Sequence, residues 1–210
     1  MIKKLYKDFL LYHNLKHKLK KHLWKIKGKV SLSFLKEDEP KDKITIESIV
    51  FSKDRPLQLH AFLSSYFENV KNYAPVNVLY YASNSQYVTA YEEVFGIFNG
   101  KIKKVIKESD FKKDLYCLLK EILSNRIIFF VDDIIVIRKF DLLDFTILPT
   151  KMFIPSLRLG KNLNFCYTFQ RKQTVPNKWI NKINIPHIFC WRWQEGEYDW
   201  GYPISMDGHI

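Results

Sequence analysis

Apolar residues in this chain gather in short continuous runs, with helical segments between them. Continuous β-branched and aromatic runs occupy residues 44–51, 75–82 and 126–138, and residues 101–107 alternate apolar and basic side chains. Helices are expected between these runs, at residues 57–70, 86–95 and 111–123, where the longer segments place apolar residues at steps of three and four. The pattern therefore predicts four strands joined by three helices, in the order βαβαβαβ.

This order predicts an α/β fold with a mostly parallel, Rossmann-like, doubly wound sheet flanked by helices. Residues 101–107 are expected near an edge of the sheet, because edge strands are often protected by lysine. Asp54 is a candidate N-cap for the first helix, and Ser109 or Asp110 for the third. Beyond residue 140 the alternation stops, and residues 203–210 resemble one last short strand.

Residues 1–29 form a separate helical pattern with a strongly basic character. They hold ten lysines and one acid, Asp8, and so carry most of the chain's net charge of +12. A basic amphipathic helix with Trp24 near its end can lie on an anionic membrane surface, and it can equally dock on the domain or on a second subunit. Nucleic acid is not an expected partner, because lysine without arginine reads bases poorly. Residues 30–43, which include Pro40, are expected to link this helix to a domain over residues 44–210.

The composition narrows the class of protein. A chain that is 47% hydrophobic and 16% aromatic is not expected to be disordered. No apolar run approaches the roughly 18 residues of a membrane span, and the N-terminus lacks the pattern of a secretory signal. The three cysteines are far apart and form no CxxC pair, which fits a reducing compartment and argues against a zinc site. We therefore expect a cytoplasmic protein, peripheral at the inner face of the plasma membrane if residues 1–29 bind lipid.

Two adjacent carboxylates, Asp132 and Asp133, interrupt the run at residues 126–138. A buried carboxylate must be neutralised, paired or bound to a cation, because its desolvation is costly. In open α/β sheets, ligands bind at the carboxyl ends of the strands, so the pair directs hard oxygen ligands to that edge. Such ligands suit Mg²⁺ or Mn²⁺. The alternative is a structural pair that caps the next element and faces water.

Two more polar segments follow predicted strands. Ser52, Lys53, Asp54 and Arg55 come after the first strand, and Ser83 and Asn84 come after the second. Further along, residues 191–201 combine three tryptophans with Tyr198 and three acids. Flat aromatic faces beside carboxylates suit the binding of a sugar. The alternative is that the tryptophans belong to the hydrophobic core and the acids face solvent.

The strand and helix order, the SKDRP loop at residues 52–56 and the VDD at residues 131–133 together resemble glycosyltransferases of the GT-A fold, and the family-2-like bacterial enzymes in particular. The resemblance covers about residues 44–140 well. It implies a nucleotide-sugar pocket and a Mn²⁺ or Mg²⁺ ion on the donor diphosphate. Carried over by position, the pocket would be lined by Ser52, Lys53, Asp54, Arg55, Ser83, Asn84 and Asp132, with Asp133, assisted by Asp132, as the metal ligand.

This sequence departs from the family pattern in two places. A strict D-x-D motif is absent, because Val131 or Ile134 stands where the family has an acid. The family's catalytic base would fall beyond Ile210, so either the chain is a fragment or Asp199 or Asp207 serves instead. Trp191, Trp193 and Trp200 are expected on the acceptor side.

The resemblance implies a metal-dependent transferase of the hexosyltransferase type. It would move a sugar from a nucleotide-sugar donor to a saccharide or lipid-linked acceptor in bacterial surface polysaccharide biosynthesis. One alternative is a sugar-phosphate nucleotidyltransferase, although the loop at residues 52–56 lacks the glycines of a phosphate-binding loop. Another is a degenerate module that binds nucleotide or a partner without turnover.

Overall fold

The computed structural model describes residues 45–146, 148, 153–177, 188–202 and 208. They fall into two compact units, one of residues 45–162 with Gly208 and one within residues 163–202. The expected basic helix at residues 1–29, the linker at 30–43 and most of the expected strand at 203–210 lie outside the described residues. Among the described helices, none combines the length and apolar character needed to cross a bilayer.

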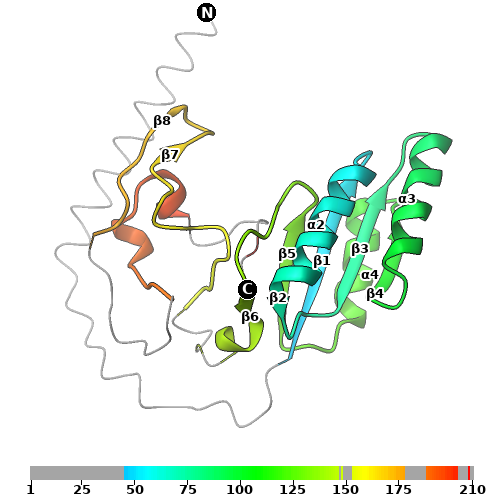
Figure 1. The fold of residues 1–210 in the computed structure, drawn as a ribbon, viewed down its shortest axis with the longest axis horizontal. Coiled ribbons are helices and arrows are strands. Elements are labelled where there is room, and N and C mark those ends of the chain that lie inside the picture. Colours follow the sequence, from blue (N-terminus) through cyan, green and yellow to red (C-terminus); the bar gives the residue numbers. More distant parts are fainter. Residues whose placement is uncertain (1–44, 147, 149–152, 178–187, 203–207, 209–210) are drawn as a thin grey trace, which may run out of the picture. The chain divides into compact units, whose positions relative to one another are not determined.

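The larger unit is built on one four-stranded parallel sheet. Its strands are β1 (Ile46–Lys53), β3 (Val76–Tyr81), β4 (Ile102–Lys107) and β5 (Arg126–Val131), in the order β4-β3-β1-β5 (Figure 1). All three pairings are parallel, which confirms the predicted α/β fold and the edge position of β4. The chain runs outward from β1 to β3 and β4, then returns to β5 on the other side of β1. The strand order thus reverses between β1 and β5, and this is where such sheets bind ligands.

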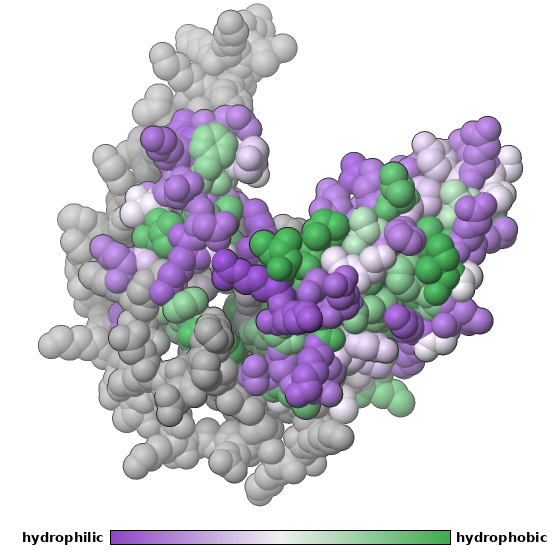
Figure 2. Space-filling view, in the orientation of Figure 1, coloured by the Kyte–Doolittle hydropathy of each residue, from purple (hydrophilic) through white to green (hydrophobic). Residues whose placement is uncertain are grey.

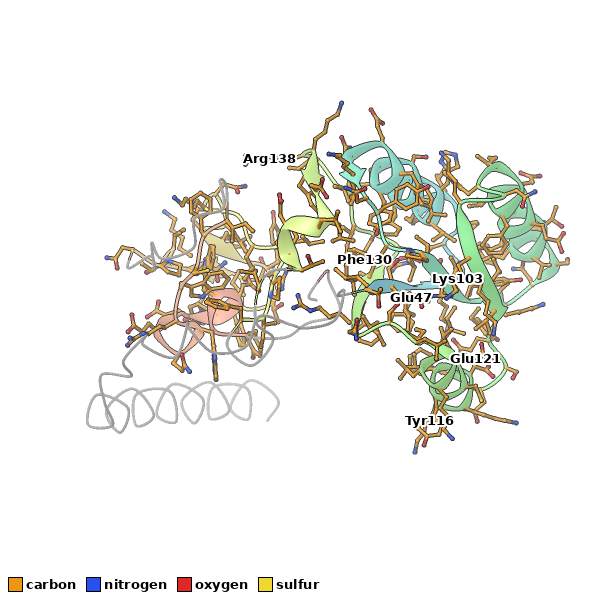
Figure 3. All side chains as sticks on the ribbon, turned by 90° about the horizontal axis from the view of Figure 1, so that it is seen from below. Glu47, Lys103, Tyr116, Glu121, Phe130 and Arg138 are labelled. Carbon is orange, nitrogen blue, oxygen red and sulfur yellow. The ribbon has the colours of Figure 1, made fainter. Side chains whose placement is uncertain are left out.

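Three helices cover the sheet, α2 (Pro56–Asn69) and α3 (Ser85–Ile97) on one face and α4 (Phe111–Glu121) on the other (Figures 1 and 3). Beneath α2 and α3 lies an aromatic core in which Phe62, Tyr66, Tyr91 and Phe130 are at most 1% exposed. The outer surface of these helices mixes hydrophobic and hydrophilic residues (Figure 2). Right-handed crossovers explain this arrangement. α2 and α3 connect strands in one direction across the sheet, whereas α4 connects β4 back to β5 in the opposite direction and so lies on the other face.

The predicted helix caps are partly confirmed. Asp110 is the N-cap of α4, and its carboxylate accepts a hydrogen bond from the backbone N–H of Lys113 at 2.9 Å. The prediction for α2 was wrong, because Arg55 occupies the N-cap position and makes no side-chain cap bond. Asp54 instead has a left-handed backbone (φ 54°), and its carboxylate accepts from the backbone N–H of Ser83.

The apolar run at residues 126–138 is a strand only as far as Val131. The residues that follow the Asp pair turn back along α2, where the Val136 N–H donates to Ser65 Oγ at 3.1 Å and Asn69 Nδ2 donates to the Val136 carbonyl at 2.9 Å. The return ends in the short strand β6 (Phe140–Asp141), which pairs in parallel with β2 (Val70–Lys71). The structure confirms the expected end of the strand at the Asp pair. A strand over the second half of the run was wrong, since composition does not show where a chain reverses.

Arg126, the first residue of β5, anchors the segment after β6. Its guanidinium is buried and donates to the backbone carbonyls of Phe145, Thr146 and Leu148 at 2.6, 3.3 and 2.5 Å. The Phe145 and Thr146 carbonyls lie at the end of a 3-10 helix at residues 142–145, and the Phe145 carbonyl also accepts from the Leu148 N–H at 3.3 Å. Arg126 adds donors where a longer helix would supply its own.

Gly208, near the end of the chain, lies against the edge strand β5 of the larger unit. Its N–H donates to the Phe129 carbonyl on β5 at 2.8 Å, and its own carbonyl accepts from Leu157 N–H at 2.9 Å. Its φ of 84° lies in the left-handed region, and an added Cβ would lie 3.2 Å from the Phe130 ring. Glycine suits this position because it tolerates both the dihedral and the close approach.

A buried carboxylate, Glu47 on β1, lies on the α4 face of the sheet. It is 4% exposed and accepts hydrogen bonds from Lys103 Nζ at 2.7 Å, Asn77 Nδ2 at 3.1 Å and Ser124 Oγ at 3.0 Å (Figure 3). Burial by itself raises the pKa of this carboxyl, but the three donors and the positive charge of Lys103 together lower it below 4.5. The ionised form of Glu47 is therefore the one that stabilises the fold.

Glu47→Gln is expected to destabilise the protein by about 2 kcal/mol at pH 7, because the amide cannot replace the charged acceptor. The folded-state pKa lies below the unfolded one, so this contribution is complete above pH 4.5 and is lost as the pH falls through the folded-state pKa. Denaturant unfolding of wild type and variant between pH 7 and pH 3 should show the gap closing on acidification. Glu121→Gln is the control, because Glu121 pairs with Lys104 at the surface and its loss should change little.

The smaller unit holds the tryptophan-rich segment. It contains a short antiparallel pair, β7 (Phe165–Cys166) with β8 (Arg171–Lys172), and two 3-10 helices at residues 193–195 and 198–201. Trp200 is 1% exposed, donates from Nε1 to the Leu163 carbonyl and meets the Trp191 ring edge-on. Trp193 is 42% exposed. The burial of Trp200 favours a structural role for that ring, and Trp193 offers the more open face.

Candidate functional site

The predicted polar residues meet at one edge of the parallel sheet. Ser52 lies near the end of β1, Asp132 directly follows β5, and Ser83 follows β3. Because β1 and β5 flank the point where the strand order reverses, their carboxyl ends open onto the region where α/β sheets bind ligands. The register brings them level, with Phe51 of β1 opposite Val131 of β5.

Asp132 is the buried member of the acidic pair. Its side chain is 5% exposed, and Oδ2 accepts a hydrogen bond from Ser52 Oγ at 2.7 Å. Burial raises the pKa of the Asp132 carboxyl above its ordinary value, although the Ser52 hydrogen bond and the Arg55 charge act to lower it. The Ser52 hydrogen bond and the nearby Arg55 guanidinium thus fix the orientation of the Asp132 carboxylate.

Asp133 is the open member of the pair. Its side chain is 59% exposed, and its Oδ2 lies 3.3 Å from Nη1 of Arg55. The same Arg55 nitrogen lies 3.6 Å from Oδ1 of Asp132. A single guanidinium, itself half-exposed, therefore faces both carboxylates. An exposed ion pair of this kind adds little to the stability of the fold.

The loop that carries Arg55 is connected to the end of β3. Asp54 accepts from the Ser83 N–H at 2.7 Å through Oδ1, and its own N–H donates to the Tyr81 carbonyl at 3.0 Å. Lys53 places its ammonium 5.1 Å from the centre of the Tyr81 ring. The left-handed backbone at Asp54 makes the sharp turn that brings these groups together, and non-glycine residues hold this conformation only where surrounding contacts fix it.

Asn84 has a structural task in this arrangement. It is the N-cap of α3, and its side chain accepts from the Tyr87 N–H at 3.0 Å. Its predicted role in the nucleotide pocket stays a prediction, as do the roles of Ser52, Lys53, Asp54, Arg55 and Ser83.

Tyr91 was not predicted as part of the site. It lies on α3, is fully buried, and places its hydroxyl 2.6 Å from Ser52 Oγ. The same hydroxyl accepts from the Arg55 N–H at 3.0 Å. Burial raises the Tyr91 pKa, so the hydroxyl stays protonated. The sequence signal was a tyrosine on an apolar helix face, which usually needs a polar partner when it is buried.

The acidic pair fits a hard divalent cation. Within the described part of the chain no three His, Cys, Asp or Glu side chains come together as a metal cluster. Mg²⁺ and Mn²⁺ need only one or two carboxylates when substrate phosphates and water complete the shell. The Arg55 guanidinium already holds positive charge beside both carboxylates, and Asp133 has oxygen exposed to a ligand.

Two residues were considered as the catalytic base, Asp199 and Asp207. Asp199 belongs to the smaller unit, where it is 8% exposed and accepts from Gln173 Nε2 at 3.0 Å, while its N–H donates to Gln173 Oε1. Asp207 lies outside the described residues. The role of either residue as base, and the acceptor role of Trp191, Trp193 and Trp200, stay predictions.

Comparison with known proteins gives a distant relative among the glycosyltransferases. The chain is 27% identical over 180 residues to the bifunctional glycosyltransferase pgtA of Dictyostelium discoideum, a match that covers 77% of this chain and 23% of that protein. No protein-family model matches the sequence, and no solved structure matches it significantly. The chain therefore spans about a quarter of its relative's length and shares distant homology with a glycosyltransferase.

Proposed function

We propose that this chain binds a nucleotide-sugar donor at the carboxyl edge of its sheet and transfers the sugar to a saccharide or lipid-linked acceptor. The observation that carries the proposal is the arrangement of Asp132, Asp133 and Arg55 where the strand order reverses. The relation to a glycosyltransferase supports it independently. The hexosyltransferase type and a place in bacterial surface polysaccharide synthesis belong to the same proposal.

The donor's nucleotide would bind against the loop at residues 52–55 and the end of β3. Asp54 and Ser83 link the two segments, so a base and ribose placed there would contact both. Arg55 and Lys53 would offer positive charge to the diphosphate. Asp133, with Asp132 beside it, would hold Mn²⁺ or Mg²⁺. When bound, that ion would neutralise the charge that develops on the leaving diphosphate.

Transfer also needs a group that accepts the proton of the acceptor hydroxyl. A carboxylate suits this task when it lies within hydrogen-bond reach of that hydroxyl. We propose Asp199 or Asp207 for it. Trp193 is the tryptophan most suited to stack on an acceptor sugar, because its ring is partly exposed.

A thermal-shift panel tests the proposal directly. Wild-type protein is mixed with UDP-glucose, GDP-mannose or dTDP-glucose, each with Mn²⁺, with Mg²⁺ and with chelator. We expect one nucleotide class to raise the melting temperature in a metal-dependent way, since a ligand at 100 times its dissociation constant adds about 2.7 kcal/mol. Absence of a shift with all three nucleotides would contradict the proposal. Binding without release of free nucleotide in the presence of acceptors would favour a non-catalytic module.

A further inference from the structure

A directed chain of hydrogen bonds ends on Asp132. Ser52 Oγ donates to Asp132 Oδ2 at 2.7 Å, and this bond uses its single hydroxyl hydrogen. Ser52 Oγ is then an acceptor toward Tyr91, which fixes Tyr91 as the donor in that bond. Tyr91 in turn accepts from the Arg55 N–H. Every donor therefore points the same way, from Arg55 through Tyr91 and Ser52 to Asp132.

This chain of hydrogen bonds joins the two halves of the site. Arg55 belongs to the loop after β1, and Asp132 follows β5. Tyr91 on α3 contacts the Arg55 backbone directly and connects to Asp132 through Ser52. Tyr91 is fully buried. Its ring packs against the rings of Tyr80 and Phe95, with centroids 4.6 and 5.9 Å away. Hydrogen bonds in series strengthen one another in a low-dielectric interior. The position of the Arg55 backbone and the orientation of the Asp132 carboxylate are thus coupled through one buried hydroxyl.

We propose that Tyr91 is a positioning residue for donor binding: its hydroxyl holds the Ser52–Arg55 loop and the Asp132 carboxylate in register. This inference rests on the proposed function of the site. It adds α3 to the elements that shape the site, which otherwise come from the ends of β1, β3 and β5. Tyr91 does not touch the donor. It acts through Ser52 and through the backbone of Arg55.

The test compares Tyr91→Phe with a matched variant, Tyr66→Phe. Both tyrosines are fully buried, and each hydroxyl accepts a backbone N–H at 3.0 Å, Tyr91 from Arg55 and Tyr66 from Ala74. Both variants should lower the melting temperature to a similar degree. Only Tyr91→Phe should weaken binding of the nucleotide sugar that the panel identifies, by roughly five- to tenfold.

Amide hydrogen exchange on the ligand-free protein supplies a second readout. Tyr91→Phe leaves the Arg55 N–H without its acceptor, so exchange at Arg55 should speed up by about tenfold, whereas Tyr66→Phe should leave it unchanged. Ser52→Ala removes the next link of the same chain. Its effect on donor affinity should therefore not add to that of Tyr91→Phe in the double variant.

The outcomes separate this inference from the proposed function. If both tyrosine variants change donor affinity alike, or if Tyr91→Phe changes neither affinity nor Arg55 exchange, Tyr91 has no positioning role even though the donor binds. If wild type binds none of the three nucleotide sugars, the proposed function fails, and exchange at Arg55 alone decides whether Tyr91 holds the loop.

Discussion

Asp133→Asn is expected to abolish the metal-dependent part of donor binding while leaving the stability of the ligand-free protein within about 0.5 kcal/mol of wild type. A neutral amide oxygen is a much weaker ligand for a hard cation than a carboxylate. The side chain is 59% exposed, and its contact with the half-exposed Arg55 contributes little to folding. The measurements are the melting temperature without ligand, donor affinity with Mn²⁺ and with chelator, and Mn²⁺ binding followed by electron paramagnetic resonance.

Asp144→Asn serves as the matched control, because it also removes an exposed carboxylate from the same unit but lies away from the sheet's carboxyl edge. It should alter neither stability nor donor affinity. A purely structural acidic pair predicts the reverse for Asp133→Asn. A destabilised variant that retains full Mn²⁺-dependent binding would refute the metal role of Asp133.

Arg126→Ala is expected to lower the free energy of unfolding by about 3 kcal/mol, or the melting temperature by roughly 6 to 12 °C. The substitution removes one buried cation and takes the Arg126 donor from the carbonyls of Phe145, Thr146 and Leu148, of which Phe145 keeps the Leu148 N–H. Hydrogen bonds to charged groups are the stronger ones, and an unsatisfied buried acceptor retains its full desolvation cost. Chemical denaturation of the purified variant measures the effect.

Two further variants make that measurement specific. Arg126→Lys keeps the charge but lacks the planar fork that reaches several carbonyls at once, so it should recover only part of the loss. Arg138→Ala removes an exposed arginine whose side chain points away from the protein (Figure 3), and it should change the stability by less than about 0.5 kcal/mol. Equal stability of Arg126→Ala and Arg138→Ala would rule out the anchoring role of Arg126.

The sheet could be predicted from sequence because its signals are local. Three strands are short apolar runs, β4 alternates apolar and basic residues, and each intervening helix has its own spacing or cap, as at Asp110. The failures occurred where a distant group decided the outcome. Asp54 has the chemistry of an N-cap, but the Ser83 N–H competes for it. The residues after Asp133 have the composition of a strand, but Ser65 and Asn69 of α2 take their backbone hydrogen bonds.

The candidate site was predictable for a similar reason, and only in part. Parallel strands bring their carboxyl ends to one edge, so polar residues after each strand are gathered by topology alone. The sequence could not show which of the two aspartates is buried, because they follow an unbroken apolar run in which no alternation is visible. In the structure Asp132 continues the buried positions 126, 128 and 130 of β5. Nor could the sequence show which polar groups Tyr91 would meet, since on α3 that residue continues an apolar helix face and its partners, Ser52 and Arg55, are distant in the sequence.

The two edges of the sheet limit how this unit can associate with other chains. On β5 the Phe129 carbonyl already accepts from Gly208, so a peptide that added a strand there would have to displace an existing hydrogen bond. β4 is an edge strand among the described residues and holds lysines at positions 103, 104 and 107, of which the first two pair with Glu47 and Glu121. Lysine on an edge strand is a common defence against strand addition. Recruitment by β-augmentation is thus disfavoured on both sides. A protein partner of this unit would have to recognise helix surfaces or the loops at the strand ends.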